Sequence, residues 1–173
     1  MTVPSQRNMT SPMSENDFDP DPLRSPGYQV RATHRAFDRL LQRHIRKHKI
    51  TNGFWYVLRA LWRREDMSQR ELADEVNLME SSTVILLDSM EKAGLIRRKR
   101  DTVDRRRIKI HLTPKARRLE QKLLPYAKEI NDVATAGIPA EDLDVFLRTA
   151  IRMRENLTAK LKADARMKPG TNR

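Results

Sequence analysis

The sequence contains no cysteine and only 5 glycines, and each shortage excludes a class of protein. Without cysteine there is no disulfide, no thiolate nucleophile, no thiol oxidation sensor and no cysteine-ligated zinc. The sequence also has no glycine-rich phosphate loop, no Ser-His-Asp arrangement and no carboxylates clustered at ligand spacing. We therefore expect neither an enzyme nor a bound cofactor. No metal site is expected either, because no metal-ligand spacing relates the histidines, which are His34, His44, His48 and His111.

Long apolar runs are missing as well. No stretch approaches the roughly 20 apolar residues that a membrane-spanning helix requires. The N-terminus lacks the continuous apolar region of a secretory signal. We expect a soluble protein of the cytoplasm.

Positive charge, in contrast, is abundant. Lys and Arg number 35 against 23 Asp and Glu, which gives a formal net charge of +12 on 173 residues. Such an excess attracts anionic partners over long range, with nucleic acid the first candidate and a membrane surface the second. The length suits a single domain.

Helices are predicted on both sides of the middle segment, between a flexible N-terminal arm and a flexible C-terminal tail. Residues 1–27 are rich in Pro, Ser, Asp and Asn without an apolar period, which is typical of a disordered arm. Apolar residues at three- and four-residue steps predict a helix from residue 28 and another from about residue 51. Thr113 and Pro114 predict the start of a long helix, and Gly137 and Pro139 separate it from a last amphipathic helix. Residues 162–173 form a basic tail.

The middle of the chain predicts two short helices followed by a hairpin. Ser68 and Glu71 have the spacing of a capping box, which marks a helix start. Asn77 suits a left-handed turn, and Gly94 suits the end of the next helix. Beyond residue 95, alternating apolar and cationic residues predict a two-stranded hairpin with a charged tip. The expected fold is mainly α with a small β-hairpin wing.

The hairpin concentrates the positive charge. Residues 97–111 carry eight cations and two carboxylates, a net of six positive charges and half of the formal +12. Charge of this density on one hairpin suits neutralisation of DNA phosphates, and an arginine at its tip suits a narrow minor groove. The alternative is a solvated hairpin with scattered charges.

Three segments follow one another in a characteristic order: residues 68–73 (Ser-Gln-Arg-Glu-Leu-Ala), residues 87–96, and the wing from Asp104-Arg105-Arg106 to Leu112-Thr113-Pro114-Lys115. Through these segments, residues 28–161 resemble the MarR-type bacterial transcription regulators. The resemblance implies a winged helix-turn-helix lobe over residues 51–113, whose second short helix enters the major groove while the wing lies at the flanking minor groove. It also implies a helical dimerisation region over residues 28–50 and 114–161.

The candidate DNA-binding residues lie on the recognition helix and the wing. On the helix, polar groups near its start suit base edges and an aliphatic side chain suits a thymine methyl group; the alternative is that the serines cap the helix and the isoleucine packs. On the wing, the family resemblance implies that Asp104 orients a neighbouring arginine, with Arg106 the first choice for the groove and Arg105 the second. The full set is Glu80, Ser81, Ser82, Ile85, Arg97, Arg98, Arg105, Arg106 and Arg107.

The helical region predicts a dimer and an effector site. Its apolar stripes exceed what a small monomer covers, and the expected dimer core is Leu143, Phe146, Leu147 and Ile151. The alternative is a monomer with a four-helix core. By resemblance, a small anionic or aromatic effector binds near the junction with the lobe. The candidates for that site are His44, Trp55, Tyr56, Arg59 and Trp62, with a core role as the alternative for the two tryptophans.

Together these features predict a ligand-responsive, sequence-specific transcriptional regulator. We expect a homodimer that represses by binding an inverted repeat in double-stranded DNA, with half-sites about one helical turn (~10 bp) apart. The alternative is a basic, nucleoid-type protein that coats DNA without sequence choice.

Overall fold

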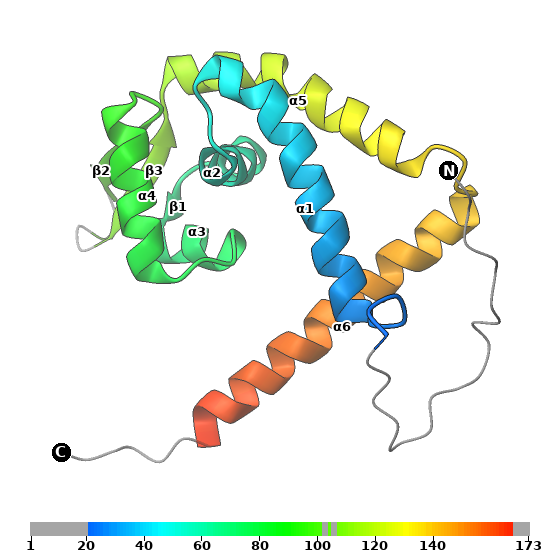
Figure 1. Ribbon diagram of the computed structural model, residues 1–173. Helices are drawn as coiled ribbons and strands as arrows, with labels where there is room; N and C mark the ends of the chain where they lie inside the picture. Colours follow the sequence, from blue (N-terminus) through cyan, green and yellow to red (C-terminus); the bar gives the residue numbers. More distant parts are fainter. Residues whose placement is uncertain (1–20, 102–103, 105–106, 168–173) are drawn as a thin grey trace. The chain divides into compact units, whose positions relative to one another are not determined.

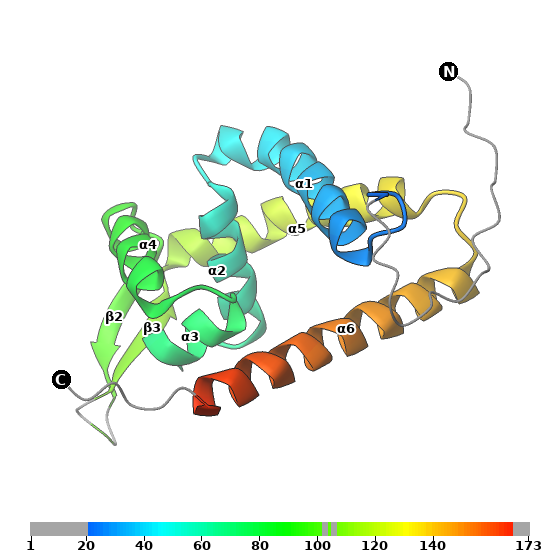
Figure 2. The same ribbon diagram turned by 60° about the horizontal axis from the view of Figure 1, so that its bottom comes forward.

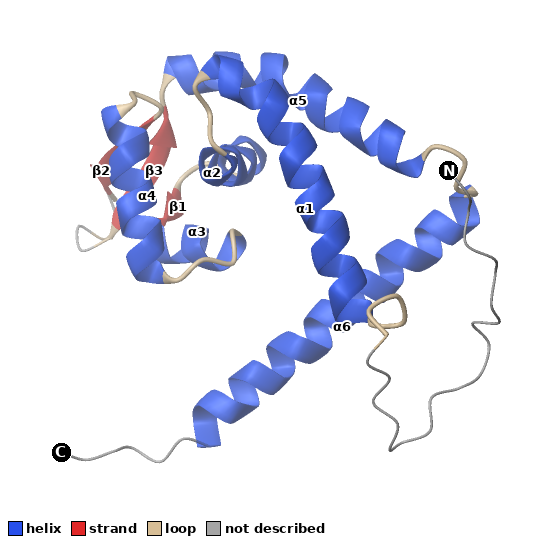
Figure 3. Cartoon of the chain, viewed as in Figure 1, coloured by secondary structure: helices blue, strands red, loops and turns tan. Residues whose placement is uncertain are grey.

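The computed structural model describes residues 21–101, 104 and 107–167. Most of these residues are helical, and three short strands form a single small sheet, as expected for a mainly α protein with a wing (Figures 1 and 3). The chain divides into two compact units, Met1–Glu120 and Gln121–Arg173. Within the described residues, no helix combines the length and apolar character needed to cross a membrane.

The first unit opens with two helices whose starts follow from their capping residues. Helix α1 (Pro26–Ile45) begins where the Ser25 side chain accepts a hydrogen bond from the Tyr28 backbone, with proline in its first turn. The helix thus starts two residues inside the predicted arm, whose residues 1–20 lie outside the described part. A 3-10 turn, η1 (Arg46–His48), leads to α2 (Asn52–Arg63), which Thr51 caps through Phe54 N.

The helix-turn-helix forms as the local sequence predicts. Ser68 and Glu71 make both bonds of the capping box at the start of α3 (Gln69–Glu75). Asn77 adopts the left-handed conformation, with φ of 53°, between α3 and α4 (Glu80–Lys92). Gly94, with φ of 68°, follows the end of α4. These positions were identified from residue chemistry alone.

The sheet has one more strand than the sequence predicted. Strands β2 (Ile96–Arg100) and β3 (Ile108–Leu112) form the expected antiparallel hairpin, and Figure 2 shows them beside α4. A third strand, β1 (Met67–Ser68), pairs with β3 so that Met67 lies opposite Ile110. Two residues are too few to show an alternating pattern, which is why the sequence predicted the hairpin but not this third strand.

The core of the first unit fixes which face of α4 is exposed. Thr83, Leu87 and Met90 recur at four- and three-residue steps along α4 and are fully buried. They belong to a core that also contains Ile45, Trp55, Leu58, Leu61, Leu72, Leu95, Ile96 and Ile110. The opposite side of α4 therefore faces outward.

The wing joins α5 through one threonine. The Thr113 hydroxyl accepts from Ala116 N at the start of α5 (Pro114–Thr135) and donates to Gly94 O at 2.8 Å. Helix α5 contains Pro125 and continues from the first unit into the second. In the second unit Gly137, with φ of 78°, precedes α6 (Ala140–Met167), which leaves Phe146, Leu147 and Ile151 about half exposed.

The capping box generates a prediction about stability. Replacing Ser68 with Ala removes the hydroxyl that bonds both the Glu71 amide and its carboxylate. We expect Ser68→Ala to lower the free energy of unfolding by about 1 kcal/mol, measured by urea denaturation at neutral pH. The control is Ser82→Ala, which alters an exposed serine. Equal losses in the two variants would contradict a capping role.

The same contacts set the pH dependence of this loss. Hydrogen bonds from the Ser68 side chain and backbone, helped by Lys109 and Arg107, hold the pKa of Glu71 below its ordinary value. A lowered folded-state pKa stabilises the protein above the ordinary carboxyl range, and this stabilisation disappears as the pH falls through the lowered value. The difference in free energy of unfolding between the wild type and Ser68→Ala should therefore become smaller as the pH falls through the lowered pKa of Glu71.

Candidate nucleic-acid interface

The outward face of α4 presents small polar and aliphatic side chains. Ser81 and Ile85 lie opposite the buried residues of the helix, and Ile85 is 70% exposed. Glu80 and Ser82 are exposed beside them. The residue that caps the helix is Met79, without a side-chain hydrogen bond, so neither serine acts as the N-cap. This face is available to a partner.

A three-residue ion-pair cluster, here called the α4–β2 clamp, joins helix α4 to the wing. It consists of Asp88 and Glu91 on α4 and Arg98 on β2. The Arg98 guanidinium lies 2.6 Å from Asp88 Oδ1 and donates to Glu91 Oε2 at 2.7 Å. The Arg98 backbone N also donates to Glu91 Oε1 at 3.0 Å. Three charged side chains thus fix one edge of α4 against β2.

The contacts of the clamp favour the charged forms of Glu91 and Arg98. The backbone and side-chain hydrogen bonds from Arg98 lower the pKa of Glu91. Burial opposes the charge on Arg98, yet its bonds to Glu91 and Asp88 raise the pKa of the guanidinium above its ordinary value. Only 20% of the Arg98 side chain is exposed. Arg98 was predicted from charge alone to contact DNA, but in the structure its guanidinium is occupied inside the lobe.

The remaining predicted wing residues fall into three groups. Arg97 is exposed and lies opposite His111 in the sheet. Arg107 is exposed and its guanidinium is 3.5 Å from the Glu71 carboxylate. Arg105 and Arg106, the first choices for the minor groove, lie outside the described residues. The predicted role of Asp104 in orienting one of these arginines therefore stays a prediction.

Glu71 contacts three parts of the lobe, although the sequence pattern predicted only its role in capping a helix. Its carboxylate accepts from Ser68 N at 2.8 Å and lies 3.6 Å from Arg64 as well as near Arg107. One side chain therefore links the end of α2, the start of α3 and the wing. The capping pattern revealed the helix start, but the contacts with the two arginines depend on tertiary structure.

The aromatic residues predicted for an effector site divide between core and surface. Trp55 is 1% exposed and meets Trp62 edge to face, with ring centroids 5.8 Å apart, which is the core arrangement named as the alternative. The Trp62 indole donates to Ala116 O at 3.1 Å. The other candidates, Tyr56, Arg59 and His44, are half-buried or exposed.

Tyr56 belongs to a small polar group between α1 and α2. Its hydroxyl donates to Asp38 Oδ1 at 2.6 Å, and its ring stacks on His34 with a centroid distance of 6.3 Å. Burial, together with the bond to Asp38, raises the pKa of Tyr56 well above its usual range. This hydroxyl therefore stays protonated and acts as a hydrogen-bond donor at neutral pH.

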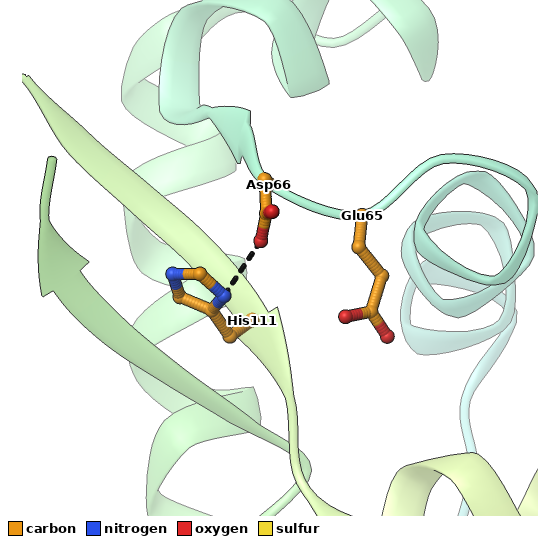
Figure 4. A group of neighbouring side chains, drawn as sticks. All are labelled: Glu65, Asp66 and His111. Carbon is orange, nitrogen blue, oxygen red and sulfur yellow. Dashed lines mark ion pairs between the residues drawn. The ribbon is translucent and has the colours of Figure 1, made fainter.

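A second polar cluster consists of Glu65 and Asp66, in the loop after α2, and His111 on strand β3 (Figure 4). His111 Nδ1 is 2.7 Å from Asp66 Oδ1, and the Glu65 carboxylate accepts a hydrogen bond from Arg117 Nη2 at 2.7 Å. Each acidic group thus has a cationic partner or a histidine. The pairs connect the loop after α2, strand β3 and the start of α5, and no local sequence pattern reveals them.

Comparison with known proteins agrees with this geometry. The MarR family model matches residues 50–108, which cover the helix-turn-helix and reach the start of β3. The HTH-type transcriptional regulator TtmR of Methylorubrum extorquens (strain PA1) is 30% identical over 135 residues, covering 77% of this chain and 67% of the relative.

Solved structures show the same architecture. The transcriptional regulator PA3341 is 31% identical with a TM-score of 0.71, covering 77% of this chain and 98% of that chain. BpsR of Bordetella bronchiseptica, whose DNA binding is regulated by 6-hydroxynicotinic acid, superposes with a TM-score of 0.68 at 20% identity, covering 75% and 93%. With a winged helix-turn-helix of matching sequence and fold, this chain belongs to the MarR family of transcriptional regulators.

Proposed function

We propose that the protein is a sequence-specific repressor that binds an inverted repeat as a homodimer and releases it when a small effector binds. The observation that carries this proposal is the outward face of α4, where Ser81 and Ile85 stand opposite the core beside a basic wing. In this arrangement the helix enters the major groove, and cations of the wing meet the flanking phosphates.

The chemistry of α4 favours sequence recognition over nonspecific coating. Its acidic residues are Glu80, Asp88 and Glu91, and its single cation is Lys92 in the last turn. A protein that coats DNA through charge would place cations on the inserted helix, because phosphate neutralisation supplies nonspecific affinity. Hydroxyls and an aliphatic side chain instead suit the base edges. In this proposal the wing supplies the charge and α4 reads the sequence.

Helix α6 supports the homodimer. Leu143, Phe146, Leu147 and Ile151 recur at helical spacing, and the last three are about half exposed in the single chain. An apolar stripe of this length on a soluble monomer is a feature of interfaces. A twofold dimer presents two recognition helices, so its site is an inverted repeat with half-sites about one turn (~34 Å) apart.

The effector proposal rests on likeness and on residues at the α1–α2 junction. BpsR responds to 6-hydroxynicotinic acid, a small aromatic anion. In this chain Arg59 is exposed on α2, and the ring of Tyr56 lies on the same helix, with its hydroxyl proton donated to Asp38. A cation near an aromatic ring suits an aromatic carboxylate, whose charge pairs with the guanidinium and whose ring packs on the tyrosine. We propose this ligand class, with His44 as a further polar contact and Trp55 excluded by its burial.

A competition measurement tests sequence-specific regulation. Labelled DNA from the region upstream of the protein's own gene is bound by the full-length protein and challenged with unlabelled DNA of the same or of random sequence. We expect the specific competitor to act at least 1,000-fold more effectively at physiological salt. Equal displacement by both competitors would contradict sequence-specific binding and favour the alternative, a protein that coats DNA without sequence choice.

The two neighbouring arginines of β2 should behave differently. Arg97→Ala should weaken DNA binding and reduce the slope of log affinity against log salt by about 1, without a change in Tm, because an exposed phosphate contact is removed. Arg98→Ala should lower the Tm as well, because Asp88 and Glu91 lose their shared partner. DNA titrations at several salt concentrations and thermal melts check both variants.

Either of two results would contradict this assignment. One is an unchanged Tm in Arg98→Ala, which would mean that the clamp does not hold the lobe. The other is an unchanged salt slope in Arg97→Ala, which would remove this arginine from the interface.

The homodimer is tested on the apolar stripe of α6. Leu147→Asp places a charge among the proposed interface residues and should convert the dimer to a monomer in sedimentation analysis, with loss of high-affinity DNA binding. The matched control is Asn156→Asp, which adds the same charge off the stripe on the same helix. A dimer that survives Leu147→Asp unchanged would show that this stripe is not the interface.

A further inference from the structure

The start of the recognition helix exposes large apolar side chains as well as polar ones. Met79 is 77% exposed and Ile85 is 70% exposed, with Leu78 and Val84 partly exposed nearby. A single exposed apolar residue is ordinary on a protein surface, but several around one helix start form a local apolar surface. Ser81 and Ser82 interrupt it, so the surface is small and mixed.

Ile85 lies on the outward face of α4, in a part of the helix that is held on its other side by the core. It lies opposite Thr83, Leu87 and Met90, which anchor α4 in the core. The turn that carries it is also held by polar contacts. Ser89 Oγ donates to Ile85 O at 3.0 Å, and the Arg98 guanidinium reaches Val84 O at 3.5 Å. The clamp therefore positions the part of α4 from which Ile85 projects.

The major groove offers one apolar feature to such a side chain. Among the groups that base pairs present there, the 5-methyl group of thymine is apolar, and the others are hydrogen-bond donors or acceptors. An isoleucine has no donor or acceptor, so it discriminates between bases through that methyl group. Ser81, one turn earlier on the same face, has a hydroxyl for a neighbouring base edge or phosphate.

We propose that Ile85 determines specificity by packing on the methyl group of one thymine in each half-site of the DNA. This inference rests on the proposed function, since it requires α4 to lie in the major groove. It goes beyond the proposed function by naming the chemical group on the DNA that Ile85 recognises. The preferred site should contain a thymine at a fixed position in both half-sites, which removal of the methyl group alone would weaken.

The test replaces thymine by deoxyuridine, which keeps base pairing and removes only the methyl group. A preferred duplex is first selected from a random library with the full-length wild-type protein. Each thymine of that duplex is then replaced in turn, and equilibrium affinity is measured for wild type, Ile85→Ala and Val84→Ala. Val84 is the matched control, because it is an adjacent aliphatic residue on the flank of the same helix.

We expect one thymine per half-site to respond. Its replacement should weaken wild-type binding about 4-fold, or about 15-fold when both half-sites are changed, as for the loss of one buried methyl contact. Ile85→Ala should bind the thymine and deoxyuridine duplexes equally, whereas Val84→Ala should keep the wild-type difference. Thermal melts establish that both variants are folded.

Two results would overturn the inference. In the first, no thymine of the selected duplex responds to deoxyuridine in the wild type; in the second, Ile85→Ala shows the same loss as the wild type. Both leave sequence-specific binding intact. If the wild type selects no preferred duplex at all, the proposed function fails and the inference fails with it, so the two failures are distinguishable.

Discussion

The pairing of Arg98 with Asp88 and Glu91 is the interaction on which the DNA-binding lobe depends. A winged helix-turn-helix has two DNA-reading elements, and they serve together only if their mutual position is fixed. The core fixes one side of α4 through Thr83, Leu87 and Met90. The clamp fixes the edge that the core does not reach, and it does so from the strand that carries the wing.

The clamp also offsets part of the negative charge of α4. Asp88 and Glu91 would otherwise add two negative charges to a surface that approaches phosphates. One guanidinium cannot neutralise both, but it pairs with them in a partly buried site, where charges interact more strongly than in water. The other exposed side chains of α4 are mainly hydroxyl and aliphatic groups, with Glu80 and Lys92 at its two ends. In the proposed complex, attraction to the DNA backbone therefore comes from the wing. This division explains how a chain of net charge +12 carries a recognition helix with one cation.

Features that depend on residues close together in the sequence were predicted correctly, whereas contacts between residues far apart in the sequence were not. The capping box at Ser68, the left-handed turn at Asn77 and the stop at Gly94 were predictable because each depends on the chemistry of a few adjacent residues. Strand β1 was missed, because its two residues acquire a strand conformation only by pairing with β3. Arg98 was assigned to DNA for a related reason. A run of cations shows where charge lies along the chain, but not that Glu91, seven residues away, will take one of them.

The rigidity of the lobe limits how an effector could act on the proposed dimer. The recognition helix and the wing are joined by charged contacts and a shared core, so a small molecule does not readily separate them. Helix α5, by contrast, runs without interruption from the lobe into the second unit, with Pro125 beyond the boundary. Two half-sites one turn apart require two lobes at a fixed separation. In such a dimer, a ligand beside α1 and α2 would act most directly by altering the separation of the lobes. Because both recognition helices must fit the repeat simultaneously, a small change in that separation weakens both half-site contacts together.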